Sequence, residues 1–238
     1  MPNTCPELLI VMPVFNEQES IQRVVTEWFA EMDRIVSNYV LLAIDDGSVD
    51  DTLAILHKLH LQIGDRLEII SRENRGHGQT CLQGYHIAAE RGIPFIFQID
   101  SDGQSDPRYF GQFWALRDQY DVIYGKRTRQ DGLRRILASF TLRCSLRILA
   151  QADCVDANVP YRLMNHRACQ SGIPFIPNDL SLANIGLAVI LRKTPSIRHG
   201  AIPIGFPPRL GGEPSVRFLQ FATKAIELFR QLKKAGIT

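Results

Sequence analysis

Two aspartates at the end of an apolar run are the residues in this sequence whose types and spacing most clearly suggest chemistry. Asp100 and Asp102 follow the run PFIFQI (94–99), and Gln104 comes shortly after them. Two carboxylates this close repel each other unless a cation or basic side chains lie between them. With the amide oxygen of Gln104 they offer hard oxygen ligands, which suit Mg²⁺ or Mn²⁺ together with water or phosphate oxygens. A solvated turn is the simpler explanation of the same motif.

Polar segments of the same kind follow other apolar runs in the first half of the chain. Strand-length runs alternate there with helical patterns, which predicts an α/β fold with a mostly parallel, Rossmann-like sheet and helices on both faces. Ligands bind at the carboxyl ends of the strands in such sheets, so these segments should meet at one edge. The runs and their following segments are LLIVM (8–12) with PVFNE (13–17), YVLLAI (39–44) with DDGS (45–48), LEIIS (67–71) with RENRGHGQ (72–79), and PFIFQI (94–99) with DSDGQ (100–104).

Helix boundaries can be predicted from capping residues and from apolar periodicity. Asn16, with Glu19 three residues later, is expected to cap a helix whose apolar stripe extends from Ile21 to Val36. Ser48 is expected to cap a second helix that continues to about Leu61. Further helices are expected at 79–91 and 134–151, a strand at 121–125, and an amphipathic helix at 215–235.

Charge is distributed unevenly along the chain. Residues 1–106 carry 17 acidic and 7 basic side chains, whereas residues 107–238 carry 8 acidic and 20 basic ones. A basic half of this kind is either a solvated surface or a site for anions or an acidic membrane surface. Nucleic acid is not among the expected partners.

Length and composition indicate a single globular domain over residues 1–238. No apolar run reaches the roughly 20 residues that a membrane-spanning helix needs. The first residues do not follow the pattern of a secretory signal, so we expect a cytoplasmic protein. The five cysteines are scattered and never form C-x-x-C, which predicts reduced thiols.

The motifs, taken together, resemble those of family 2 glycosyltransferases with the GT-A fold. The branch they resemble is that of the dolichyl- or polyprenyl-phosphate sugar synthases, which includes dolichol-phosphate mannose synthase. Beyond the four segments above, the motifs that carry the resemblance are GKRT (125–128), Arg135-x-x-x-Ser139, DANVPYRLMNHRA (156–168) and IPIGFPPRLGGEPS (202–215). The resemblance implies a nucleotide-sugar-binding half at 1–106, an acceptor-side half at 107–214 and a C-terminal helix at 215–235.

The resemblance also implies a role for each matching residue. The nucleotide of a UDP- or GDP-sugar would be bound by Pro13, Phe15, Glu17, Asp45, Asp46 and Gly76. The Mg²⁺ or Mn²⁺ ion on the diphosphate would be bound by Asp100, Asp102 and Gln104. The phosphate of a polyprenyl phosphate acceptor would be bound by Arg127, Arg135, Ser139 and Arg209. The residues expected to act in catalysis are Asp100, Asp102, Arg127 and Arg135.

The implied reaction is a metal-dependent, inverting transfer to an acceptor that is already anionic and therefore needs no general base. Such a protein is expected at the inner face of a membrane, through a peripheral contact or a membrane partner. One alternative is transfer to a soluble glycan or protein hydroxyl, with Asp179 as the base. Others are a non-catalytic nucleotide-sugar-binding subunit and a phosphatase with an aspartate nucleophile, whose further motifs are not matched here.

Overall fold

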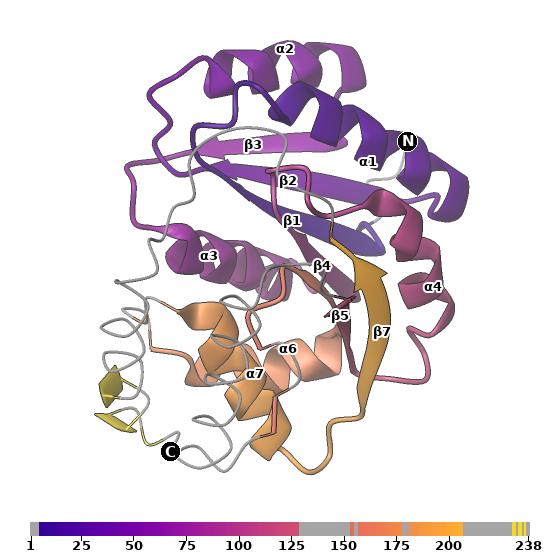
Figure 1. The fold of residues 1–238 in the computed structure, drawn as a ribbon, viewed down its shortest axis with the longest axis vertical. Coiled ribbons are helices and arrows are strands. Elements are labelled where there is room, and N and C mark those ends of the chain that lie inside the picture. The colour runs from indigo at the N-terminus through magenta and orange to yellow at the C-terminus, as the bar shows by residue number, and fades with distance from the viewer. Residues whose placement is uncertain are drawn as a thin grey trace.

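The computed structural model describes residues 5–128, 153–154, 157–177, 180, 182–206, 230–231, 233–234 and 236. Within these residues the chain forms a seven-stranded sheet with the strand order β3-β2-β1-β4-β6-β5-β7 (Figure 1). The strands are β1 (Leu8–Val14), β2 (Tyr39–Asp45), β3 (Leu67–Ser71), β4 (Phe95–Ile99), β5 (Val122–Thr128), β6 (Tyr161–Asn165) and β7 (His199–Gly205).

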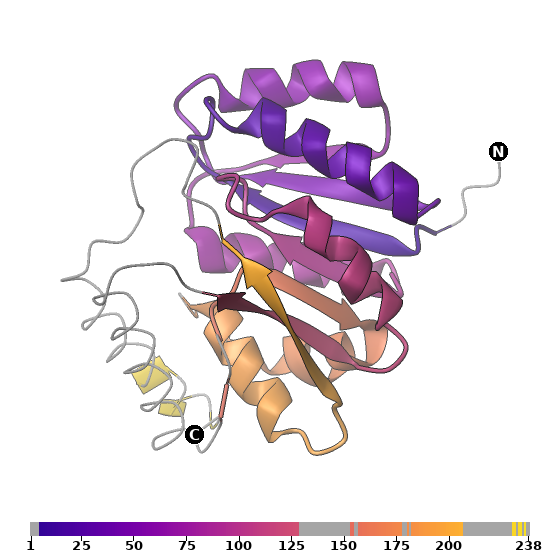
Figure 2. The same cartoon turned by 45° about the vertical axis from the view of Figure 1, so that its right-hand side comes forward.

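Helices cover both faces of this sheet, as the sequence predicts. The helices α1, α2 and α4 lie on one face, and α3, α6 and α7 lie on the other (Figures 1 and 2). The helices are α1 (Ile21–Ile35), α2 (Thr52–Ile63), α3 (His77–Glu90), α4 (Phe110–Ala115), α6 (His166–Gly172) and α7 (Ala183–Lys193), with short 3₁₀ helices at Pro107–Tyr109 and Ile173–Phe175. None of the helices in the described ranges is long and apolar enough to cross a membrane.

The direction of the strands determines which loops share an edge. β1 pairs in parallel with β2 and β4, β2 with β3, and β5 with β7. β6 runs antiparallel to its neighbours β4 and β5. The carboxyl ends of β1, β2, β3, β4, β5 and β7 therefore lie on one edge, where β6 begins.

The core explains why the first strands could be predicted from their composition. All seven residues of β1 are buried, because helices cover both of its faces. An aromatic cluster then fixes α1 and α4 on the sheet: the ring of Phe97 lies 5.6 Å from that of Trp28 and 5.0 Å from that of Phe110, centroid to centroid. These contacts hold β4, and with it the loop that follows Ile99, in a fixed place.

The predicted caps of the first two helices are wrong. Ser20, not Asn16, precedes α1, and Asp51, not Ser48, precedes α2. Asn16 has a φ of 53°, which asparagine tolerates better than most residues. Its side chain accepts a hydrogen bond from the backbone of Val49, in the loop after β2. Contacts between loops have therefore replaced the local capping that the sequence suggests.

A glycine in α3 allows this helix to lie close to the sheet. A Cβ atom added at Gly84 would lie 2.3 Å from Cγ1 of Val11 in β1. We therefore expect Gly84→Ala to lower the free energy of unfolding by about 1–3 kcal/mol through overpacking. Chemical denaturation would measure this change.

Gly111 in α4 provides a matched control. Its added Cβ would meet Ile35 only at 3.5 Å, an ordinary contact, so Gly111→Ala should leave the stability unchanged or raise it slightly. Equal changes in the free energy of unfolding for the two substitutions would show that the space between α3 and β1 does not require a glycine at position 84.

Candidate active site

The loops after β1 and β2 are joined directly at the carboxyl edge of the sheet. The backbone amide of Asn16 donates to Ser48 Oγ at 2.9 Å, and that of Glu17 donates to Thr52 Oγ1 at 2.8 Å. The segments PVFNE and DDGS thus lie together, as the parallel sheet predicts. Phe15 is 43% exposed beside them, so its ring is accessible to a ligand.

Thr52 is buried and holds the backbone of Glu17 in place. Thr52→Val keeps the shape of the side chain but leaves the amide of Glu17 without its partner. We expect a loss of about 1–3 kcal/mol in the free energy of unfolding, since a buried donor would be unsatisfied. Thr26→Val, at an exposed hydroxyl bonded to Gln22 in α1, is the control and should change stability by less than about 0.5 kcal/mol. An equally small effect at Thr52 would contradict this role.

Glu17 is buried, and the hydroxyl of Ser20 lies between its carboxylate and the loop after β4. Ser20 Oγ lies 2.7 Å from Glu17 Oε2 and 3.1 Å from the carbonyl oxygen of Ser101. The hydroxyl of Ser101 in turn donates to the carbonyl oxygen of Pro13 at 2.9 Å. The loop that contains the paired aspartates is therefore tied to the end of β1.

Asp45 and Asp46 are both buried but have different surroundings. Asp45 accepts hydrogen bonds from the backbone of Ser48 at 3.2 Å and from the hydroxyl of Ser71 at 3.0 Å. It thus lies between the ends of β2 and β3, at the ligand edge.

Asp46 organises the loop that leads into α3. One carboxylate oxygen accepts from the amide of Arg75 at 3.0 Å and lies 2.9 Å from Arg72 Nη2, while the other accepts from the amide of Gly76 at 2.8 Å. Gly76 has a φ of 90°, a conformation that favours glycine. The amide of Gly76 therefore donates to Asp46 and is not available to a ligand. Asp46 fixes the conformation of the loop that borders the site.

The paired aspartates lie at the end of β4, where the sequence places them. The side chain of Asp100 is 25% exposed, and Asp102 is 9% exposed. Asp102 Oδ1 accepts a hydrogen bond from the amide of Gln104 at 3.0 Å, which closes the turn. Within the described residues no group of three or more His, Cys, Asp or Glu side chains is arranged to hold a metal ion. A cation at this turn would therefore need oxygen ligands from a bound molecule or water.

A buried polar network extends behind Asp100. Gln98 lies under α3 and α7, with Nε2 at 3.4 Å from Asp100 Oδ1. The hydroxyl of Tyr85 lies 3.3 Å from Gln98 Oε1 and 2.7 Å from Asn184 Oδ1. Asp100 is thus positioned from two helices as well as from its own strand.

The acceptor-side residues are only partly described. Arg127 lies at the end of β5, on the same edge of the sheet, and its guanidinium carbon is 5.4 Å from the centroid of the Phe206 ring. Three other predicted residues, Arg135, Ser139 and Arg209, lie outside the described residues, as does the alternative base Asp179.

The model of the family described as Glycosyl transferase family 2 matches residues 9–171, which is more than half of the chain. The chain belongs to this family. The matched region includes the loops that contain Glu17, Asp45 and Asp102, together with the end of β5.

Some of the curated relatives of this chain have names that refer to polyprenyl-type lipids. The chain is 33% identical over 130 residues to the dodecaprenyl-phosphate galacturonate synthase of Rhizobium johnstonii, covering 53% of this chain and 38% of that one. It is 26% identical over 162 residues to the polyprenol monophosphomannose synthase of Mycolicibacterium smegmatis, covering 65% and 60%. The chain spans about half the length of the curated relatives it matches.

A solved structure confirms the predicted GT-A fold. The glucosyl-3-phosphoglycerate synthase of Mycobacterium tuberculosis, in complex with Mn²⁺, UDP-glucose and phosphoglyceric acid, superposes with a TM-score of 0.68 at 17% identity. The match covers 98% of this chain and 81% of the other. The family 2 chain described here therefore has this fold.

The sequence interpretation missed one residue of the site. His77, the first residue of α3, has Nε2 at 2.9 Å from Asp100 Oδ1. The side chain of His77 is 50% exposed; desolvation acts to lower its pKa, but interactions with Cys81 and Asp100 outweigh this effect and raise the pKa well above its usual value. The sequence predicts that RENRGHGQ (72–79) shares an edge with the turn after β4, but it assigns no role to His77.

Proposed function

We propose that this glycosyltransferase moves a sugar from a nucleotide diphosphate to a polyprenyl phosphate. The observation that carries the proposal is that the paired aspartates and Arg127 lie at one edge of the sheet, at the ends of β4 and β5. One group suits a metal on a diphosphate, and the other suits a second phosphate. The names of the lipid-phosphate relatives support the same acceptor class.

The donor nucleotide would be held at the ends of β1 and β2. The half-exposed ring of Phe15 provides a surface against which a base can stack. The carboxylates of Glu17 and Asp45 would accept hydrogen bonds from a base or from ribose hydroxyls, and Pro13 would border the same subsite. Asp46 and Gly76 would act indirectly, since their mutual hydrogen bond shapes the loop before α3.

The carboxylates of Asp100 and Asp102 fit a divalent cation that is completed by substrate oxygens. Two carboxylates in one turn, with Gln104 nearby, are enough for Mg²⁺ or Mn²⁺, which retain phosphate and water ligands. When bound, such a cation would neutralise the diphosphate that leaves the sugar. The amino terminus of α3 would add positive charge beside it.

The acceptor phosphate would act as the nucleophile without help from a base. A phosphate oxygen would attack the anomeric carbon while the bond from that carbon to the diphosphate breaks, and the electron pair would leave with the diphosphate. Attack from the opposite side inverts the anomeric centre. The role of Arg127, together with Arg135, Ser139 and Arg209, would be to hold two mutually repelling phosphates within reach of each other.

A polyprenyl acceptor implies a reaction at a membrane surface. We infer that the enzyme works from the cytoplasmic side as a peripheral protein or with a membrane partner. The apolar and basic pattern of residues 215–235 suits an interfacial helix, although most of this segment lies outside the described residues.

Replacing Arg127 by glutamine should weaken the binding of the acceptor but not that of the donor. We expect the KM for polyprenyl phosphate to rise about tenfold or more, because a charge-assisted bond to a phosphate is lost. Binding of the donor, measured by calorimetry, should change less than twofold. Lys126→Gln, at the preceding exposed residue of β5, is the control. If Arg127→Gln weakened the binding of the donor and left the KM for polyprenyl phosphate unchanged, Arg127 would belong to the donor site.

The proposed function can be tested by transfer of labelled sugar from a panel of UDP- and GDP-sugars to polyprenyl phosphate in detergent. We expect a glycolipid whose formation requires Mg²⁺ or Mn²⁺ and whose anomeric configuration is inverted. Transfer only to water-soluble glycans or proteins would show that the acceptor is a soluble hydroxyl rather than a lipid phosphate. Donor binding without transfer to any acceptor would indicate a non-catalytic subunit.

A further inference from the structure

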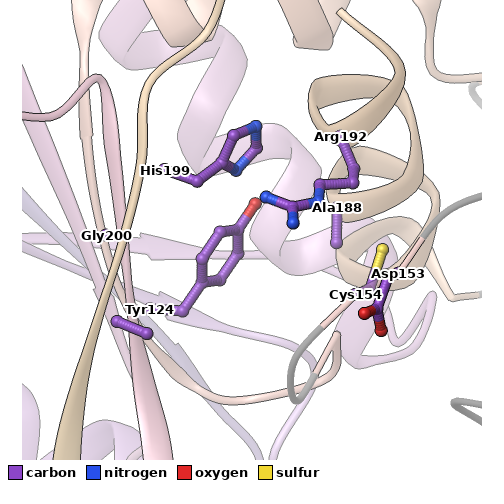
Figure 3. Close-up of a pocket in the computed structure, with 8 residues that line it drawn as sticks. Tyr124, Asp153, Cys154, Ala188, Arg192, His199 and Gly200 are labelled. Atoms are coloured by element: carbon purple, nitrogen blue, oxygen red, sulfur yellow. The ribbon is translucent and has the colours of Figure 1, made fainter.

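A pocket with a volume of 210 Å³ lies between α7 and the strands β5 and β7 (Figure 3). The helix α7 lies on the opposite side of the molecule from α1 and α2 (Figure 1). Its polar lining groups come from Tyr124 in β5, Arg192 in α7 and His199 in β7. The guanidinium group of Arg192 points into the pocket toward Tyr124, and the imidazole ring of His199 lies above the phenol (Figure 3). None of these residues belongs to the site at the carboxyl ends of the strands.

The hydroxyl of Tyr124 is the first sign that this pocket takes a ligand. Tyr124 is only 8% exposed, and its hydroxyl oxygen has no hydrogen-bond partner. Burial raises the pKa of Tyr124 to about 12, so the group is a protonated donor. Buried polar groups are normally satisfied, and one that borders a cavity without a partner is placed to donate to a molecule inside it.

A buried arginine packs against this tyrosine from behind the residues that line the pocket. Arg162 in β6 is completely buried, and its Nη2 donates to the carbonyl oxygens of Ala157 and Asn184. Its Nε and Nη1 have no partner, and no carboxylate in the described part of the chain pairs with it. Its guanidinium carbon lies 5.1 Å from the centroid of the Tyr124 ring.

The charges around the pocket determine the kind of ligand. Arg162 is a buried positive charge without a counter-ion, which is costly unless an anion lies nearby. Arg192, an exposed residue of α7, adds a second positive charge to the lining of the pocket. Asp153 is the acidic group among the described lining residues, and it lies at the wall away from His199 (Figure 3). The positive end of the pocket thus favours an anion.

The size of the pocket limits the ligand further. Sites for drug-sized ligands usually begin at about 300 Å³, so 210 Å³ is too small for a nucleotide sugar or an isoprenoid chain. We propose that this pocket binds the phosphate group of a small phosphorylated molecule, or free phosphate, between Tyr124, Arg192 and His199. The apolar side chains of Ala188 and Cys154 would contact any short organic part of that molecule.

The proposal can be tested by titrating the protein with inorganic phosphate at constant ionic strength while recording the NMR signals of the His199 ring. These signals can be assigned from the spectrum of His199→Gln, and they report on this pocket rather than on the donor site. We expect saturable shifts for the wild type. Tyr124→Phe and Arg192→Gln should each weaken binding about tenfold, because each removes a donor to the anion. Arg167→Gln, an exposed arginine of α6, should leave binding unchanged.

Thermal unfolding separates a ligand site from a purely structural tyrosine. Since the Tyr124 hydroxyl has no partner, Tyr124→Phe should not lower the unfolding temperature in phosphate-free buffer, but it should reduce the rise that phosphate causes. Propyl phosphate in place of phosphate would show whether the ligand is an ester, because the tail would then tighten binding. Unchanged phosphate affinity in both Tyr124→Phe and Arg192→Gln, or the absence of saturable shifts at His199, would overturn the proposal.

Discussion

Replacing Asp102 by alanine should lower sugar transfer by about a thousandfold or more, since the loss of a metal ligand at the leaving diphosphate removes several kcal/mol of transition-state stabilisation. The metal dependence of donor binding should disappear at the same time. Calorimetry with the donor, with and without Mn²⁺, would measure this effect separately from turnover. The same variant loses the carboxylate that accepts from the amide of Gln104, so the turn after β4 should also become less ordered.

Asp118→Ala is the control for this experiment. The side chain of Asp118 is 78% exposed, and its Oδ2 lies 3.9 Å from Nη2 of Arg117, which is a long and weak ion pair. Its replacement should therefore leave transfer unaffected. If Asp102→Ala kept metal-dependent donor binding and full turnover, the paired aspartates would not be the metal site. The acidic turn would then have only a structural role.

Replacing Asp46 by alanine should produce the largest loss of stability among the substitutions considered. Three donors would lose their partner: the amides of Arg75 and Gly76 and the guanidinium of Arg72. Since the side chain of Arg72 is only 13% exposed, its charge would be left almost buried and without a counter-ion. We expect a loss of about 3–5 kcal/mol in the free energy of unfolding. This corresponds to a decrease of roughly 6–20 °C in Tm for a chain of this length.

Asp51→Ala is a matched control within the same loop. Asp51 is exposed and makes no side-chain hydrogen bond to the start of α2, so its removal should change stability by less than about 0.5 kcal/mol. A small effect at Asp46 as well would mean that the loop before α3 is held by other contacts. Donor affinity should decrease with Asp46→Ala, since the loop that it shapes borders Asp45.

The first four strands could be predicted because each combines an apolar run with a polar segment at its carboxyl end. β6 was not predicted as a strand, because YRLMN contains Arg162, a charged residue that is rarely completely buried. β7 contains glycine and proline and alternates between buried and exposed residues, as edge strands do. The predicted strand at 121–125 continues to Thr128, so Arg127 belongs to a strand rather than to a basic loop.

The features of the site that could not be predicted from the sequence are contacts between residues that are distant along the chain. The residue types and the strand ends predicted that Glu17, Asp45 and Asp102 would share an edge. Nothing in the local pattern predicts that His77 contacts Asp100, or that Asn16 bonds to the loop after β2 instead of capping α1. These contacts depend on the register of the sheet and on the close packing of α3, both of which arise only in the folded chain.

The central claim is that the acceptor of this family 2 glycosyltransferase is a lipid phosphate, with the phosphate itself as the nucleophile. It is tested most directly by offering one donor, with metal, to a polyprenyl phosphate and to the polyprenol of the same chain length. We predict a glycolipid from the phosphate and none from the alcohol, because the phosphate is already anionic at neutral pH whereas an alcohol needs a general base to become a nucleophile. Equal transfer to the polyprenol, or transfer only to a soluble hydroxyl, would contradict the account.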